Sequence, residues 1–249
     1  MSSWPRGWLV PDWPAPARVR ACVTTRSGGV SCAPFDTFNL GNHVDDLPQA
    51  VAENRRRLRE GLEIQPAWLS QVHSADVVRA DPGVQQVADA SWSETPGVAC
   101  AVLSADCLPV LFCDRAGTRV AAAHAGWRGL AGGVLEATVE ALDTSADQLM
   151  AWLGPAIGPE AFEVGAEVRE AFVTQHARAA AAFRPSRNAG RYMADLYQLA
   201  RIRLSTLGLV DVYGGGFCTF SDPRFYSYRR AAQTGRFASL IWLDDGAAG

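Results

Sequence analysis

The chain has 249 residues, of which 48% are apolar and 20% charged, and its formal net charge is −3. This length and composition predict one large α/β domain over residues 1–249, and they exclude a disordered or coiled-coil protein. The small negative charge provides no general attraction to nucleic acid. All 23 basic residues are arginine, which excludes lysine-dependent Schiff-base and P-loop chemistry.

The N-terminal segment has no basic start followed by an apolar core, so it does not resemble a secretion signal. No apolar run approaches the length needed to span a membrane. We therefore expect a cytoplasmic protein without a membrane partner, whose six cysteines are reduced. Residues 1–17, rich in tryptophan and proline, are expected to form an irregular arm on the surface.

Apolar periodicity and turn residues predict the elements in chain order. Strands are expected over residues 18–24, within 67–78 on both sides of a polar break, and over 98–103, 108–113, 119–124, 149–153, 210–213 and 237–243. Helices are expected over residues 48–62 with Asp46 as a cap, 130–142, 167–175, and up to Leu207 from a cap at Asp195. Residues 30–45 are predicted to be a long functional loop and residues 176–192 a mobile segment.

Strands outnumber helices, and several follow one another after a short turn. This spacing favours mixed or antiparallel pairing over a doubly wound parallel sheet. The predicted fold class is therefore α/β, a single-domain layered sandwich of mixed, largely antiparallel sheets flanked by helices.

Polar side chains with metal-binding chemistry lie at the breaks between apolar segments. His43, His73 and His124 occupy such breaks, and so does Cys107. Zinc binds neutral imidazole and thiolate, and three ligands from separate segments suit a catalytic site with one open position. The set His73, Cys107 and His124 is therefore a candidate metal site.

The spacing alone leaves other interpretations open. Each histidine is equally compatible with a bonded turn residue, and Cys107 with a small buried residue. A nucleophilic Cys107–His124 pair would use the same residues without metal. Asp106 is suited either to orienting a ligand imidazole or to capping a turn. Four histidines are too few for several copper centres, because one blue-copper site would take two histidines and a cysteine.

Two basic segments are candidate anion sites. Arg128 lies in a glycine-bounded turn before a predicted helix, whose first N–H groups can bind an anion. Arg229, Arg230 and Arg236 lie near aromatic residues and can form a surface for a base and a phosphate. A tight turn and a solvated loop are the respective alternatives.

Several motifs together resemble one family. In order they are T-T-R-S-G-G-V-S (24–31), F-N-L-G-N-H-V (38–44), E-N-R (53–55), S-Q-V-H-S (70–74), A-D-C-L-P (105–109), H-A-G-W-R-G (124–129), L-G-P-A-I-G-P (153–159), F-Y-S-Y-R-R (225–230) and T-G-R (234–236). On these motifs the chain resembles the laccase-domain family, also called the YfiH or polyphenol oxidase family, whose members include the mammalian protein FAMIN.

The resemblance implies a zinc site at His73, Cys107 and His124. It also implies phosphorolysis of adenosine, inosine, guanosine or methylthioadenosine, and deamination of adenosine, with a purine nucleoside and phosphate as the small-molecule partners and protein partners left open. The implied fold resembles the catalytic domain of cytotoxic necrotizing factor. The oxidase label is discounted on the histidine count.

Further hypotheses concern the substrate and the alternatives to this activity. Asn39, His43 and Arg55 are candidates for contacts to substrate or phosphate, and Phe38 or Trp127 for stacking on the purine. Some bacterial relatives are linked to hydrolytic editing of peptidoglycan precursors, so a metal-free Cys–His hydrolase is one alternative. A non-catalytic regulatory module with structural zinc is another.

Overall fold

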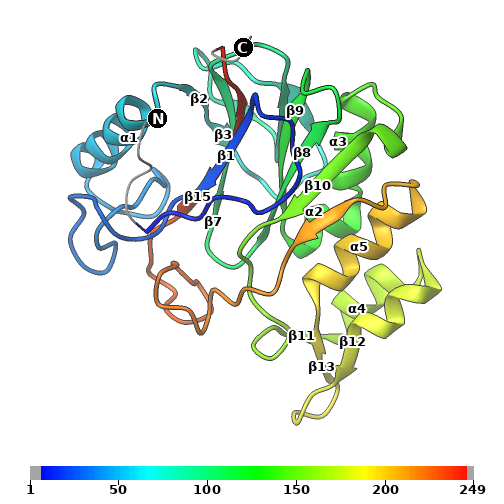
Figure 1. Ribbon diagram of the computed structural model, residues 1–249. Helices are drawn as coiled ribbons and strands as arrows, with labels where there is room; N and C mark the ends of the chain where they lie inside the picture. Colours follow the sequence, from blue (N-terminus) through cyan, green and yellow to red (C-terminus); the bar gives the residue numbers. More distant parts are fainter. Residues whose placement is uncertain (1–6, 246–249) are drawn as a thin grey trace.

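The computed structural model describes residues 7–245, and two main β-sheets lie at its centre (Figure 1). The four-stranded sheet has the order β1 (Val19–Val23), β15 (Phe237–Leu243), β7 (Val98–Ser104) and β2 (Gln65–Ala67). The six-stranded sheet has the order β14 (Val212–Gly214), β10 (Leu149–Leu153), β8 (Leu108–Asp114), β9 (Val120–Ala125), β6 (Ala90–Ser93) and β4 (Val77–Arg79). Both sheets mix antiparallel and parallel pairs, which confirms the predicted fold class.

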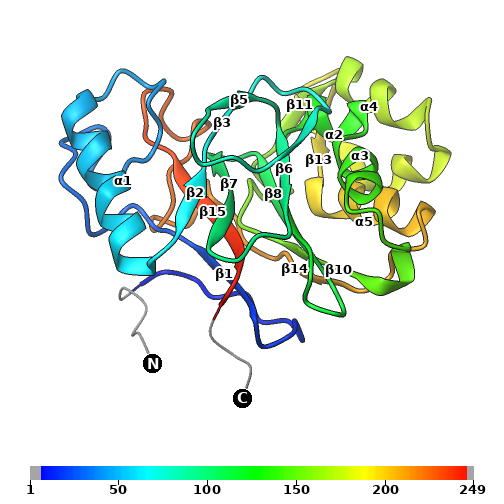
Figure 2. The same cartoon turned by 90° about the horizontal axis from the view of Figure 1, so that it is seen from above.

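Helices cover the outer faces of both sheets. The helices are α1 (Pro48–Leu62), α2 (Trp127–Gly132), α3 (Val134–Ala141), α4 (Ala166–Val173) and α5 (Leu196–Thr206), with 3₁₀ turns at Ala146–Gln148 and Ala177–Ala182. In Figure 2, α1 lies outside the four-stranded sheet, and α2, α3 and α5 lie outside the six-stranded sheet. The fold is thus a four-layer α/β/β/α sandwich.

Strand β7 illustrates why the sequence forms these layers. Its residues Cys100 and Val102 pack between the two sheets, whereas Ala99, Ala101 and Leu103 pack toward α1. Successive side chains of a strand point to opposite faces, so a strand that is covered on both faces needs a continuous apolar run. The same reasoning applies to β8 and β15, which are buried along their whole lengths.

The strand–turn–strand segments fold in two different ways. β8 and β9 form the antiparallel hairpin that the sequence predicts. β7 and β8, although only a short polar segment separates them, belong to different sheets. The segment from Ala105 to Cys107 is therefore a crossing between the two layers of the sandwich.

The predicted helix over residues 130–142 is divided into two. Helix α2 begins earlier, at Trp127, and ends before Gly133, whose φ of +97° interrupts the helical backbone before α3. Glycine adopts this left-handed conformation without the steric cost that a Cβ atom causes. Residues 125–129, predicted to form a turn, instead contain Ala125, the last residue of β9, and the first turn of α2, which begins at Trp127.

Other differences lie at the margins of the predicted elements. Asp46 does not cap α1, because its carboxylate accepts from Ser31 Oγ and Asn39 Nδ2 instead. The expected mobile segment over residues 176–192 holds a 3₁₀ turn and part of a small sheet. That sheet consists of β11 (Glu163–Gly165), β13 (Arg191–Ala194) and β12 (Phe183–Pro185), and a further pair is formed by β3 (Leu69–Ser70) and β5 (Gln86–Val87).

The N-terminal arm runs without regular structure over residues 7–17, and Leu9 forms an isolated bridge to Val23. Residues 1–6 of the predicted arm lie outside the described residues. All six cysteines are free thiols. Within residues 7–245, no helix is both long enough and apolar enough to cross a membrane.

The cap of α5 gives a test of the local sequence reasoning. Asp195 accepts a hydrogen bond from Gln198 N at 3.0 Å, as the sequence predicts for an N-cap. We expect Asp195→Ala to lower the free energy of unfolding by about 1 kcal/mol, because one N–H group at the helix start loses its acceptor. Asp195→Asn should retain nearly wild-type stability in the same chemical denaturation experiment. Equal losses in both variants would contradict the capping role.

Candidate functional site

The segment that crosses between the sheets carries the first candidate ligand, Cys107. Asp106 in this segment has a φ of +102°, and Ile157 N donates to its carbonyl oxygen at 2.9 Å. Its side chain accepts from Thr219 Oγ1 and from the backbone N–H of Arg229. Asp106 thus anchors two distant loops to the crossing, and it does not contact an imidazole as the sequence had suggested.

His124 lies near the end of β9 and is 4% exposed. Its Nδ1 is 2.8 Å from Oδ1 of Asp89, which is fully buried and lies directly before β6, where its carbonyl accepts from His124 N. This contact engages Nδ1, so Nε2 is the nitrogen left to bind a ligand. Sequence reasoning missed Asp89, although a single acid between two alanines at the start of an apolar segment was a usable signal.

The loop after β3 carries His73, and Asp89 holds this loop as well. Asp89 Oδ2 accepts from the backbone N–H groups of Val72 and Ser74, at 3.0 and 2.7 Å. The Gln71 side chain bonds both the N–H and the carbonyl of Leu103, at the end of β7. These bonds support His73 in a left-handed conformation, with a φ of +63°, and direct its exposed ring toward the other two residues.

The three predicted ligands meet at one point. Donor atoms of His73, Cys107 and His124 lie within 4.8 Å of one another. Cys107 Sγ is 3.9 Å from His73 Nε2, and the two imidazole rings pack edge to face with centroids 4.9 Å apart. A tetrahedral zinc ion needs donor separations of roughly 3.3–3.8 Å, so a small closing movement allows all three to bind one metal ion.

The electrostatics of the group favour its anionic sulfur. Burial disfavours the Cys107 thiolate, but His124 and then His73 outweigh this effect and lower the pKa of the thiol to about 6. Burial also disfavours the His124 imidazolium, and the Cys107 and Asp89 charges outweigh it and raise the pKa of His124. The group therefore supplies a thiolate, the form of cysteine that binds metals.

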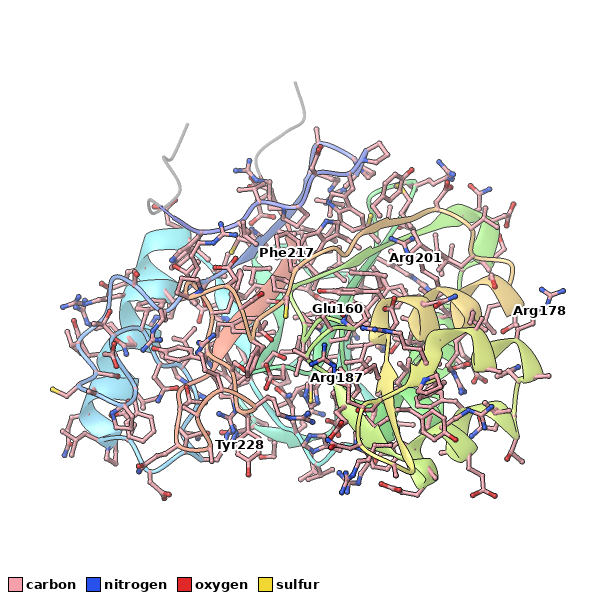
Figure 3. The ribbon with its side chains drawn as sticks, turned by 90° about the horizontal axis from the view of Figure 1, so that it is seen from below. Glu160, Arg178, Arg187, Arg201, Phe217 and Tyr228 are labelled. Atoms are coloured by element: carbon pink, nitrogen blue, oxygen red, sulfur yellow. The ribbon has the colours of Figure 1, made fainter. Side chains whose placement is uncertain are left out.

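A cavity of about 440 Å³ opens onto the three residues. Its wall combines aromatic, apolar and cationic side chains. Beyond the triad they are His43, Gln71, Leu103, Ser104, Ala105, Asp106, Trp127, Arg128, Ile157, Phe162, Tyr228, Arg229 and Arg236. Tyr228 is exposed and lies on the segment between β14 and β15 (Figure 3). The volume lies in the range typical of small-molecule sites.

Of the predicted substrate contacts, His43 lines this cavity but Asn39 and Arg55 do not. Asn39 is fully buried, and both ends of its amide bond to protein groups. Arg55 donates to the Leu40 carbonyl and stacks over the Trp68 ring at 4.3 Å. Both residues support the loop over residues 38–46, which carries His43.

Of the two aromatic residues considered for stacking, Trp127 lines the cavity whereas Phe38 is buried against α1 and the four-stranded sheet. Burial, and then the charges of Arg236 and Arg55, lower the pKa of His43. His43 is therefore neutral near pH 7 and presents both a donor and an acceptor nitrogen.

The family described as multi-copper polyphenol oxidoreductase laccase matches residues 20–244. The chain belongs to this family. A purine nucleoside phosphorylase of Pseudomonas aeruginosa is 71% identical over 96% of this chain and 99% of its own length. The purine nucleoside phosphorylase YfiH of Escherichia coli is 55% identical over 94% of this chain and 98% of its own length.

Solved structures of the family have the same fold. A protein of Neisseria meningitidis is 53% identical and superposes with a TM-score of 0.94, over 96% of this chain and all of its own. YlmD of Geobacillus stearothermophilus is 30% identical, with a TM-score of 0.91 over 98% of each chain. Within residues 7–245, the triad is the single group of three or more candidate ligands, too few donors for several copper ions.

The Asp89 contact predicts a tautomer-dependent metal affinity. In Asp89→Asn, the backbone N–H groups of Val72 and Ser74 are donors and need an acceptor, so the side-chain oxygen of the new asparagine must face them. Its NH₂ group then faces His124 Nδ1. The imidazole proton then moves to Nε2, which no longer binds a metal. We expect the metal affinity to fall about 10–100-fold in a competition titration with a chelator.

Asp106→Asn is the matched control for this variant. Its amide oxygen can accept from Arg229 N while its NH₂ donates to Thr219 Oγ1, so wild-type metal affinity is expected. If both variants bind metal as the wild type does, Asp89 does not tune the ligand.

Close packing around Gly126 gives a second test. A Cβ atom on Gly126 would lie 2.9 Å from Cys107 Sγ and 3.0 Å from His73 Cδ2. Gly126→Ala should therefore displace both ligands and reduce the metal content of the purified protein. Gly132→Ala is the control, because its new methyl group lies at an ordinary 3.9 Å from Ala75 Cβ. Full metal occupancy in Gly126→Ala would refute this account of the site.

Proposed function

We propose that the protein is a zinc-dependent purine nucleoside phosphorylase acting on adenosine, inosine, guanosine or methylthioadenosine, and that it also deaminates adenosine. The convergence of His73, Cys107 and His124 at one end of a cavity carries this proposal. The names of the Pseudomonas aeruginosa and Escherichia coli relatives support the phosphorylase activity.

The residues of the site fit a zinc ion. Two imidazoles and one thiolate are donors that zinc takes in catalytic sites, and all three residues line the cavity. His73, Cys107 and His124 would hold the ion, and Asp89 would fix the orientation of His124. When bound, zinc supplies a Lewis acid next to the reacting groups.

The cavity wall offers surfaces for each part of the substrate. The Trp127 ring provides a flat apolar face on which a purine can stack. Neutral His43 can hydrogen-bond either to the base or to the ribose hydroxyls. Arg128, Arg229 and Arg236 on the wall provide positive charge for phosphate.

In phosphorolysis, a phosphate oxygen bonds to C1′ of the ribose as the bond from C1′ to the purine nitrogen breaks. The bonding electron pair leaves with the purine, which takes up a proton, and ribose 1-phosphate is the second product. In deamination, water replaces the amino group at C6 and ammonia leaves.

One observation supports a second candidate function. Cys107 Sγ lies 3.9 Å from His73 Nε2, and the histidines favour its thiolate. A metal-free hydrolase would use this thiolate as a nucleophile. The two functions differ in their response to metal removal, because chelation stops a zinc enzyme and leaves a metal-free thiol hydrolase active.

Two measurements on one preparation of the purified protein test the proposal: its metal content, and the products that it forms from nucleosides. The purified protein should contain about one zinc per chain, as expected for one three-ligand site. Adenosine with phosphate should give adenine and ribose 1-phosphate, whereas inosine formed without phosphate reports deamination. Cys107→Ala should stay folded, lose zinc, and lose phosphorolysis by at least about a hundredfold, more than loss of an outer-shell partner causes.

The control is the surface variant Cys32→Ala, because Cys32 is exposed and lies outside the cavity wall. Full turnover in Cys107→Ala would overturn the site assignment. Turnover that survives chelation in the wild type would favour the hydrolase. Copper instead of zinc in the purified protein would overturn the metal assignment.

A further inference from the structure

Arginines outnumber carboxylates among the residues that line the cavity. Arg128, Arg229 and Arg236 line it, and none of them forms an ion pair within residues 7–245. Asp106 is the one acidic residue of this lining, and it accepts hydrogen bonds from Thr219 Oγ1 and from the backbone N–H of Arg229, so it balances only part of the positive charge. A cavity with this charge attracts an anion.

The three guanidinium groups differ in how many of their N–H donors already form hydrogen bonds within the protein. Arg128 is exposed and stacks on Trp127 at 4.5 Å, and its guanidinium group forms no hydrogen bond with any residue that the structure describes. Arg229 donates hydrogen bonds from both terminal nitrogens, Nη1 and Nη2, to the backbone carbonyls of Ala161 and Glu163. Arg236 uses only Nη1, which donates to the carbonyls of Thr234 and Gly235 at 3.0 Å.

Arg236 therefore keeps Nε and Nη2 without a partner among the described residues, on a guanidinium group that is already fixed through Nη1. Nε and Nη2 together form the edge with which arginine binds two oxygens of a phosphate or carboxylate. The neighbouring residue Phe237 pairs with Ser104, only three residues before Cys107. This edge thus belongs to the same cavity as the candidate metal ligands.

A buried amide holds the backbone of Arg236 in place. Asn39 Oδ1 accepts from Arg236 N at 2.8 Å and also from Gly41 N. Asn39 Nδ2 donates to Asp46 Oδ2. The backbone carbonyl of Asn39 accepts from Asn54 Nδ2 on α1. Helix α1 and the loop before it therefore determine where Arg236 enters the cavity.

We propose that Arg236 binds the phosphate co-substrate through Nε and Nη2, and that Asn39 is a positioning residue that acts through the backbone of Arg236. This assignment rests on the proposed phosphorylase function. Under this assignment, Asn39 acts without touching the substrate. Phosphate binds the Nε and Nη2 edge of Arg236, which forms no hydrogen bond with any described residue.

Steady-state kinetics on the zinc-loaded enzyme, with phosphate and nucleoside varied in turn, test the assignment. Arg236→Gln should raise the KM for phosphate about 10–100-fold, as expected for the loss of charge-assisted hydrogen bonds, and leave zinc content and the KM for nucleoside near wild type. Arg236→Lys should rescue this KM only partly, because lysine keeps the charge but not the two-point geometry. Arg187→Gln, in the turn between β12 and β13 (Figure 3), is the control and should have no effect.

The positioning role of Asn39 requires a double variant. Asn39→Ala should also raise the KM for phosphate, and adding it to Arg236→Gln should cause little further change, because both act on one interaction. Additive effects on the KM for phosphate would overturn the positioning role. If Asn39→Ala does not fold, Asn39→Ser, which retains a hydroxyl acceptor, replaces it in the same cycle.

Titration calorimetry with inorganic phosphate separates this inference from the proposed function. A wild-type enzyme that phosphorolyses nucleosides while Arg236→Gln keeps its KM for phosphate would overturn the inference alone. A wild type that cleaves no nucleoside would overturn the proposed function. In that case, phosphate binding by the wild type that is lost in Arg236→Gln would still support the anion site, and equal binding by both proteins would overturn it.

Discussion

The contact between Asp89 and His124 is the interaction on which the site depends. One oxygen of the buried carboxylate meets His124 Nδ1 at 2.8 Å, and the other holds the backbone on both sides of His73. A single side chain thus selects the tautomer of one candidate ligand and places the loop of another. Because Asp89 is fully buried, losing any of these hydrogen bonds would leave a polar group without a partner in the interior, at a free-energy cost of about 1–3 kcal/mol. Burial therefore holds His124 and the backbone around His73 in one arrangement.

The sandwich explains why the ligands come from distant segments. Cys107 lies where the chain passes from the four-stranded to the six-stranded sheet, and His124 lies on the strand that pairs with β8. His73 approaches from a loop that Gln71 attaches to the end of β7. Each ligand is therefore held by a different part of the scaffold, and Gly126 leaves the space in which Cys107 and His73 meet.

Three polar networks hold the segments that line the cavity. Asp89 supports the candidate metal ligands, and Asp106 attaches Thr219 and Arg229 to the crossing segment. The third network runs through Asn54 and Asn39, which connect α1 to the backbone of Arg236. Buried networks of this kind fix one arrangement of the loops, because each unmet bond is costly in a low dielectric.

The sequence by itself determined most strands, the helices α1, α4 and α5, and the three candidate ligands. Continuous apolar runs such as residues 98–103 show strands buried on both faces, and the polar breaks after them point to His73, Cys107 and His124. The helix over residues 48–62 and the cap at Asp195 follow from local side-chain chemistry, which acts within one helical turn.

Only the tertiary structure decided which side chains meet across the layers. Asp89 and not Asp106 reaches an imidazole, because the register of β6 against β9 places Asp89 beside His124. Asn39 and Arg55 support a loop instead of lining the cavity, and β7 and β8 separate into two sheets. Periodicity reports only which face of an element is apolar, whereas register and sheet assignment depend on contacts between residues far apart in the chain.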